Sequence, residues 1–171
     1  LVTLSPWKKD QMLWDPCCGT GTILIEAAYL RAHRAPGLTR SFACESWSGA
    51  PRAEMNRLRA QAEARFDPSL IGAIGGSDID PEALKLCKRH LQQAGLGGRV
   101  TVMQKDLRQL QLEADAPLFL LNPPYGERLS DRKQCEGLYR ALRELRDRHP
   151  GSDLAVITAH TGFERCFGQR A

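Results

Sequence analysis

Short apolar runs alternate with longer amphipathic stretches along almost the whole chain. Each run is bounded by glycine, proline or acidic residues, which is typical of strands, and the longer stretches repeat apolar residues at helical spacing. The predicted strands are residues 12–14, 71–78, 100–102, 117–121 and 154–158, and the predicted helices are residues 23–34, 51–66, 82–94 and 134–149.

Strands that alternate with helices indicate an α/β fold built on a mostly parallel sheet. Several of the strands are apolar on both faces, so we expect helices to cover both sides of the sheet. In such sheets a ligand binds at the carboxyl ends of the strands. Polar residues follow four of the predicted strands, at residues 15–21, Asp78, Asp106 and residues 122–125, and this predicts one shared site.

Composition narrows the class of protein only moderately. The chain has 171 residues, 42% of them hydrophobic, and a formal net charge of +4, which neither requires nor excludes a nucleic-acid partner. The longest apolar runs are far shorter than the roughly 20 residues of a membrane-spanning helix. We therefore expect a cytoplasmic protein that does not span a membrane.

The six cysteines do not form a recognisable metal or disulfide pattern. No C-x-x-C pair is present, no histidine lies at zinc spacing, and Cys17 and Cys18 are adjacent. We interpret the cysteines as free thiols in a reducing compartment, and we predict no metal site.

A glycine-containing loop, Asp-Pro-Cys-Cys-Gly-Thr-Gly-Thr over residues 15–22, connects the first strand to the first helix. Its glycines let the backbone approach a ligand, although glycine required only for packing is an alternative. The loop matches neither a phosphate-binding Walker loop nor a dinucleotide G-x-G-x-x-G. Asp78 also lies much farther along the chain than the ~20 residues expected of a nicotinamide site, and taken alone it is equally interpretable as a helix N-cap.

Asn122-Pro123-Pro124-Tyr125 follows an apolar strand. Consecutive prolines cannot donate to the sheet, so the chain must leave it there, and their carbonyl groups stay available as acceptors. The Asn122 amide oxygen and the Pro123 carbonyl can both accept from an exocyclic amine, and Tyr125 can stack on a planar ring. A purely structural turn is the alternative.

These two motifs resemble S-adenosylmethionine-dependent amino-methyltransferases. With Gly-Glu-Arg after Tyr125, the likeness is strongest to THUMP-containing bacterial guanine-N2 methyltransferases of large-subunit ribosomal RNA, often labelled N6-adenine-specific DNA methylases. Residues 40–43, Glu45, Trp47 and residues 76–81 extend the resemblance over residues 13–167. It implies a Rossmann-like class I methyltransferase fold truncated at its C-terminal strands. Residues 1–171 would form a methyltransferase domain cut from a longer chain, without the N-terminal RNA-binding domain.

The resemblance also implies a role for each site residue. The methionine moiety of S-adenosylmethionine would be wrapped by the loop, with Asp15 near its ammonium group. Asp78 would accept from the ribose hydroxyls and Asp106 from the adenine amine. The implied cofactor-binding residues are Asp15, Pro16, Cys17, Gly19, Thr20, Gly21, Thr22, Asp78, Ile79, Asp106 and Leu107, and the implied catalytic residues are Asn122, Pro123, Pro124 and Tyr125.

The expected reaction is methyl transfer to the exocyclic N2 amine of a guanine in large-subunit ribosomal RNA. It needs no covalent nucleophile, and we interpret Cys17 and Cys18 as small loop residues. Three alternatives stay open: N6-adenine methylation of DNA, a non-catalytic RNA-binding module of the same fold and, less favoured, protein-glutamine methylation. Arg128, Arg132 and Lys133 follow the second motif and are candidates for contacts with RNA phosphates.

Overall fold

The part of the chain that the structure describes contains five strands, which form one fully parallel sheet. The computed structural model describes residues 1–123 and 129–168, and its strand order is β3-β2-β1-β4-β5. The strands are β1 (Leu13–Asp15), β2 (Ile74–Asp78), β3 (Thr101–Gln104), β4 (Leu118–Leu121) and β5 (Asp153–Val156). The α/β fold class predicted from the alternation of patterns is confirmed.

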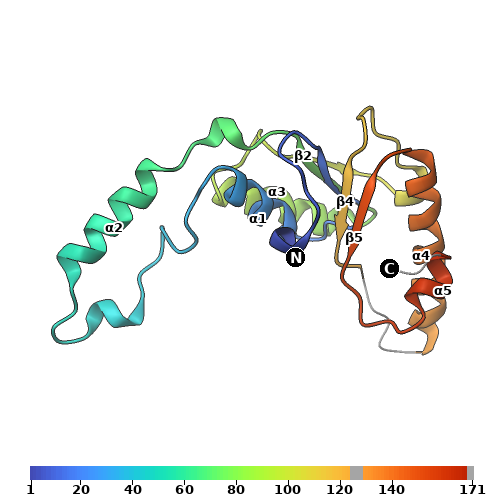
Figure 1. The fold of residues 1–171 in the computed structure, drawn as a ribbon. Helices are drawn as coiled ribbons and strands as arrows, with labels where there is room; N and C mark the ends of the chain where they lie inside the picture. Colours follow the sequence, from blue (N-terminus) through green and yellow to red (C-terminus); the bar gives the residue numbers. More distant parts are fainter. Residues whose placement is uncertain (124–128, 169–171) are drawn as a thin grey trace.

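Helices cover both faces of the sheet and enclose two separate apolar clusters. One cluster joins α1 (Thr22–Arg31) and α3 (Pro81–Gln93) to the sheet. The other joins α4 (Leu129–Arg148) and α5 (Phe163–Phe167) to the opposite face. Figure 1 shows this layered arrangement, with α1 and α3 on one side of the strands and α4 and α5 on the other.

Close packing in the middle of the sheet depends on glycine in β2. A Cβ atom on Gly75 would lie 2.4 Å from the ring of Trp14 on the neighbouring β1, so only glycine leaves room for the indole. The indole Nε1–H donates to Ser77 Oγ at 3.2 Å, and both side chains are buried. The glycines that weaken the apolar pattern of β2 are therefore required by its neighbour.

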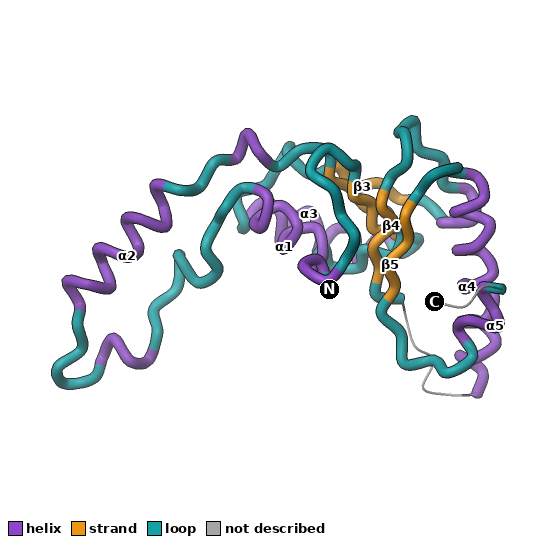
Figure 2. Tube along the Cα trace, in the orientation of Figure 1, coloured by secondary structure: helices purple, strands orange, loops and turns teal. Residues whose placement is uncertain are grey.

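A long arm between α1 and β2 projects away from the sheet. It includes α2 (Arg52–Ala64), which has no buried residue, and Figures 1 and 2 show it extending well beyond the rest of the molecule. Glu45 connects α2 to the segment before it in the arm. Its carboxylate accepts from the Arg59 guanidinium at 2.6 and 3.0 Å and from the Phe42 amide at 2.8 Å. Trp47, next to this ion pair, is 67% exposed.

The helix boundaries differ from the predictions at several points. Residues 23–34 were predicted as helix, but α1 ends at Arg31 because the backbone changes course at His33, which has a positive φ of 55°. The helix predicted from residue 134 begins at Leu129. The short helix α5 was not predicted, because five residues are too few to show helical periodicity.

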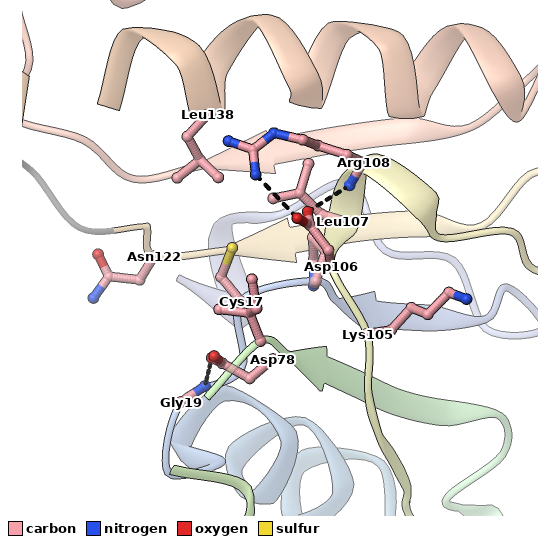
Figure 3. A pocket seen from close by; sticks show the side chains of 11 residues that line it. Cys17, Gly19, Asp78, Lys105, Asp106, Leu107, Arg108, Asn122 and Leu138 are labelled. Carbon is pink, nitrogen blue, oxygen red and sulfur yellow. Dashed lines mark hydrogen bonds and ion pairs between the residues drawn. The ribbon is translucent and has the colours of Figure 1, made fainter. Parts of the chain in front are cut away.

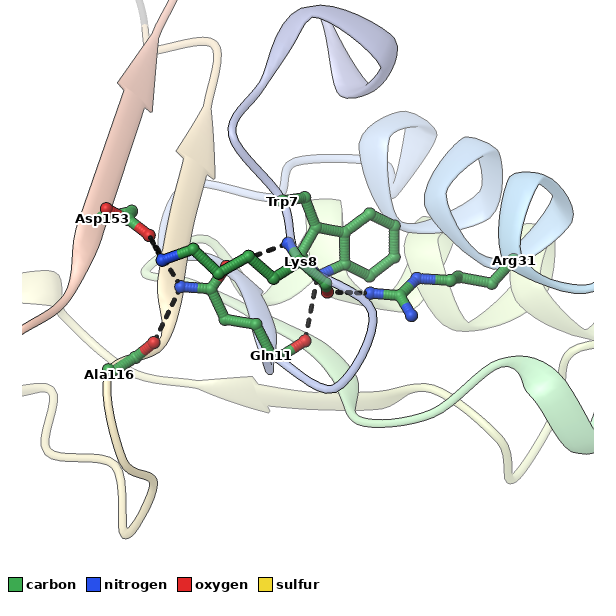
Figure 4. A network of polar contacts seen from close by, with 6 residues as sticks. All are labelled: Trp7, Lys8, Gln11, Arg31, Ala116 and Asp153. Carbon is green, nitrogen blue, oxygen red and sulfur yellow. Dashed lines mark hydrogen bonds and ion pairs between the residues drawn. The ribbon is translucent and has the colours of Figure 1, made fainter.

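Polar contacts join residues 7–11, in the N-terminal segment, to the rest of the domain (Figure 4). Arg31 stacks over the Trp7 ring at 3.9 Å and donates to the carbonyl of Lys8. Lys8 and Gln11 both contact the Asp153 carboxylate, at 3.1 and 2.9 Å. These contacts join the segment to α1 and to the start of β5, at the edge of the sheet where the strands begin.

Candidate active site

The carboxyl ends of the strands surround a pocket of about 390 Å³. Such a volume is in the range of small-molecule sites, roughly 300–1,000 Å³. Figure 3 shows residues from the ends of β1, β2, β3 and β4, and from the loops that follow them, gathered at one edge of the sheet. The lining residues are Pro16, Cys17, Gly19, Asp78, Ile79, Lys105, Asp106, Leu107, Arg108, Asn122 and Leu138.

Asp78 holds the glycine loop against the end of β2. One carboxylate oxygen accepts from the Gly19 amide at 2.8 Å and the other from the Asp80 amide at 3.0 Å. The N-cap of α3 is Asp80, whose side chain accepts from the Glu82 amide, so Asp78 is not the helix cap that it could have been on sequence alone. Gly19 has a φ of +50°, and no atom lies within 4 Å of the place where a Cβ would be.

Asp106 follows β3, and its carboxylate contacts a residue of the same loop. Its carboxylate accepts from the Arg108 amide at 2.9 Å and pairs with the Arg108 guanidinium at 3.0 Å, as drawn in Figure 3. The next residue, Leu107, is buried and also lines the pocket. The carboxylate and the apolar side chain thus occupy adjacent positions on the pocket wall.

Asp15 is near the pocket in sequence but does not line it. Its side chain is buried and accepts from the Cys17 amide at 3.0 Å. Burial raises the pKa of Asp15 to about 8, although the bond from the Cys17 amide opposes that shift. At neutral pH the carboxyl group is therefore mostly protonated. Its predicted place beside a ligand ammonium stays a prediction.

The other loop residues divide between the pocket and the packing of the loop. Pro16, Cys17 and Gly19 line the pocket, whereas Thr20, Gly21 and Thr22 do not. A Cβ on Gly21 would lie 2.6 Å from the Cys87 sulfur of α3, so packing alone explains that glycine. The binding roles implied for Thr20, Gly21 and Thr22 remain predictions.

The two adjacent cysteines are poor candidates for nucleophiles. Burial raises the pKa of the Cys17 thiol, and a hydrogen bond with Cys87 raises that of Cys18. Because the thiolate is the reactive form of cysteine, both groups are held in the unreactive state. This agrees with their interpretation as small loop residues.

Asn122 brings the second motif to the same pocket. It follows β4 directly, is exposed, and lines the pocket together with Asp78 and Asp106. Pro123 is buried. Pro124 and Tyr125 lie outside the described residues, as does Arg128, and the side chains of Arg132 and Lys133 are likewise not described.

Three lining residues were not predicted from the sequence. Lys105 and Arg108 lie close to Asp106 in sequence, and this closeness was the only signal that they could line the site. The signal is weak, because isolated cations are common on protein surfaces. Leu138 belongs to the apolar face of the helix predicted at residues 134–149, and its sequence position gave no sign that it would line the pocket. Among the described residues, no group of three or more histidine, cysteine, aspartate or glutamate side chains is arranged to hold a metal ion.

A parallel sheet with a glycine loop after β1, one acidic residue at the end of β2, another after β3, and Asn-Pro after β4 defines a class I methyltransferase domain. The chain belongs to the UPF0020 family, described as the RMKL-like methyltransferase domain, whose sequence profile matches residues 1–171. The family resemblance read from the two motifs is confirmed.

Two curated relatives cover nearly the whole chain. The chain is 32% identical over 173 residues to "Putative RNA methyltransferase YpsC" of Bacillus subtilis, covering all of this chain and 44% of that protein. It is 36% identical over 165 residues to ribosomal RNA large subunit methyltransferase K/L of Allochromatium vinosum, covering 93% of this chain and 22% of the relative. The chain thus spans less than half the length of either protein.

Two solved structures share the fold closely. The "predicted N6-adenine-specific DNA methylase" from Listeria monocytogenes aligns with a TM-score of 0.94 at 35% identity. The structure described as "SMU.472, a putative methyltransferase complexed with SAH", where SAH is S-adenosylhomocysteine, aligns with a TM-score of 0.92 at 33% identity. Each alignment covers 99% of this chain and 45% of the other.

No helix within residues 1–123 and 129–168 is long and apolar enough to cross a membrane.

Proposed function

We propose that the pocket binds S-adenosylmethionine and that the protein transfers the cofactor's methyl group to an exocyclic amine of a nucleic-acid base. The observation that carries this proposal is the meeting of Asn122 with Asp78 and Asp106 in one pocket. The complex of SMU.472 with SAH supports the choice of cofactor.

The donor and acceptor groups of the pocket suit this cofactor. A nucleoside sulfonium offers ribose hydroxyls and amines as donors, and Asp78 and Asp106 present carboxylate oxygens that can accept from them. Ile79, which is 64% exposed, and Leu107 give apolar surface for a purine ring. Gly19 lets the backbone approach the ligand, because nothing occupies the place of its missing side chain.

Catalysis then depends on alignment more than on proton transfer. The bound cofactor supplies an electrophilic methyl group on sulfur. The Asn122 amide oxygen and the Pro123 carbonyl accept from the two hydrogens of the target amine and direct its lone pair toward the pocket. Holding the reacting groups in line is worth roughly 7–11 kcal/mol in well-oriented systems.

We further propose that the substrate is a guanine of large-subunit ribosomal RNA, methylated at N2. The name of the Allochromatium relative, a large-subunit ribosomal RNA methyltransferase, supports the RNA. The guanine N2 position rests on the resemblance of the Asn-Pro-Pro-Tyr-Gly-Glu-Arg segment. Adenine N6 in DNA is the second candidate, and the description of the Listeria structure favours it.

One assay separates these substrates. The full chain is incubated with S-adenosylmethionine labelled in its methyl group and either unmodified large-subunit ribosomal RNA or plasmid DNA, and the product is digested to nucleosides. We expect label in N2-methylguanosine from the RNA. Label in N6-methyladenine of the DNA would replace the RNA proposal, and no transfer despite cofactor binding would point to the non-catalytic alternative.

A further inference from the structure

A second hollow, of about 270 Å³, lies at the same edge of the sheet as Asn122. It lies between α4 and the segment that follows β5. The Ile157 amide donates to the Leu121 carbonyl at 3.2 Å, so the chain leaving β5 begins beside the end of β4. The hollow is lined by Glu136, His160, Thr161, Gly162 and Arg165, none of which belongs to the larger pocket.

Two arginines share one carboxylate at the hollow: Arg165 and Glu136 belong to its lining, and Arg140 lies beside Glu136. Glu136 is 3.7 Å from the Arg165 guanidinium and 3.4 Å from that of Arg140. The side chain of Arg165 is 81% exposed, and an exposed pair at that separation contributes little energy. The Arg165 guanidinium can therefore turn to a ligand at small cost, and Glu136 then still has Arg140 as a partner.

His160 adds a donor whose proton has a defined place. Its Nδ1 accepts from the Gly162 amide at 3.0 Å, so the neutral ring carries its proton on Nε2. The ring packs edge-on against Tyr139, with 5.4 Å between the ring centroids. The Tyr139 hydroxyl in turn lies 2.9 Å from Thr158 Oγ1. The imidazole is thus held by contacts on two sides.

We infer that this hollow binds a backbone phosphate of the RNA beside the target nucleotide. Arg165 supplies the charge, since its planar fork of donors matches phosphate oxygens, and His160 and Thr161 supply further donors. The inference rests on the proposed function, because it takes RNA as the substrate whose base is presented to Asn122.

The test compares Arg165→Ala and Arg165→Lys with a matched control, Arg99→Ala. Arg99 is an exposed arginine in the turn before β3, at the opposite edge of the sheet. Binding of the full chain to an unmodified transcript of large-subunit ribosomal RNA is measured over a salt series, and affinity for SAH is measured by calorimetry.

We expect Arg165→Ala to weaken RNA binding and to flatten the plot of log K against log salt by about one unit, the share of one phosphate contact. Arg165→Lys should keep the slope with reduced affinity, because it keeps the charge but loses the fork. Both variants should bind SAH like the wild type.

A slope in Arg165→Ala equal to that of Arg99→Ala would overturn the inference, as would no binding of the wild type to the transcript. A parallel loss of SAH affinity would also count against it, since the two sites would then not be separate. The proposed function fails by a different result, namely no methyl transfer by the wild type in the nucleoside assay.

Discussion

Asp78 supports the pocket in two ways, by its own oxygens and by holding the Gly19 amide. We predict that Asp78→Ala lowers affinity for SAH at least about tenfold, because one or two charge-assisted bonds of roughly 1.5–3 kcal/mol are lost. Calorimetric titration measures this. Asp80→Ala is the matched control: it removes the cap of α3, costing about 1 kcal/mol of stability, but leaves the pocket intact.

Cys17→Ser should weaken cofactor binding less than Asp78→Ala, since the thiol lines the pocket without a charge to offer. Wild-type affinity in Asp78→Ala would show that the ribose hydroxyls are bound elsewhere.

Asn122 is placed to act on the substrate amine. We predict that Asn122→Ala leaves SAH affinity within about twofold and lowers turnover on the order of 100-fold, because a poorly oriented amine loses the benefit of alignment. Single-turnover methyl transfer to ribosomal RNA, with calorimetry in parallel, gives both values. Full turnover with weakened SAH binding would place Asn122 in the cofactor site alone.

The buried Asp15 carboxyl makes stability depend on pH. Its pKa of about 8 is above the unfolded value of 3.8, so the folded protein binds the extra proton and its stabilising contribution is lost as pH rises. Between those values each pH unit costs about 1.4 kcal/mol. Asp15→Asn keeps an acceptor for the Cys17 amide without the charge.

We therefore expect urea denaturation of Asp15→Asn to show a growing advantage over the wild type from pH 5 to pH 8, at on the order of 1 kcal/mol per pH unit. Parallel curves for the two proteins across this range would mean that Asp15 titrates normally.

Residue patterns predicted which strand ends meet, but they could not predict how each side chain is used. Asp15, Asp78 and Asp106 look alike in sequence, each an acid at or shortly after the end of a predicted strand. Only the path of the following loop decides that Asp15 is buried on the Cys17 amide while the other two face the pocket. That path depends on tertiary packing, which the local sequence does not encode.

At the scale of elements, the arm is the least supported part of the described structure. A 13-residue helix with no buried side chain is marginal by itself in water. The stability of α2 therefore depends on the contacts of Glu45 with Arg59 and with the Phe42 amide. We predict that Glu45→Gln speeds amide exchange at Phe42 and along α2, without a change in β1 or β4, because the Arg59 pair and the Phe42 bond weaken together.

Hydrogen exchange followed by mass spectrometry measures this effect. Glu54→Gln is the matched control, since it removes an ion pair with Arg57 within α2 and leaves the Glu45 contacts intact. Equal exchange in the two variants would contradict the role of Glu45. The Arg59 hydrogen bonds hold the pKa of Glu45 at about 2, below its ordinary value of 4.5, so its contribution is complete at neutral pH and is lost progressively as the pH falls from about 4.5 to about 2.

The elements themselves were largely predictable, and the exceptions have physical reasons. The central strands β1 and β4 were found because a parallel strand covered on both faces is a continuous apolar run. The end of α1 was misplaced because the chain turns at His33, where φ is +55°. The residues 40–47 that carry part of the family resemblance gave no sign that they would lie on a projecting arm.

For the whole molecule, cofactor binding should appear as stabilisation against heat. A ligand at 100 times its Kd adds about 2.7 kcal/mol to the folded state, and for a chain of this size that corresponds to a rise in Tm of roughly 5–11 °C. Differential scanning fluorimetry with SAH measures the rise. At the same SAH concentration Asp78→Ala should show a clearly smaller one, and an equal rise in both proteins would locate SAH outside this pocket.

The strand order also has a consequence for how the chain acquires its structure during synthesis. Leu13 in the central strand pairs with Ile74 on one side and with Leu118 on the other. A nascent chain therefore carries an apolar first strand whose second neighbour has not yet been translated, and the whole arm leaves the ribosome before the sheet can close. Contacts so distant in sequence make folding slow. We expect the growing polypeptide to depend on chaperones until β4 has emerged.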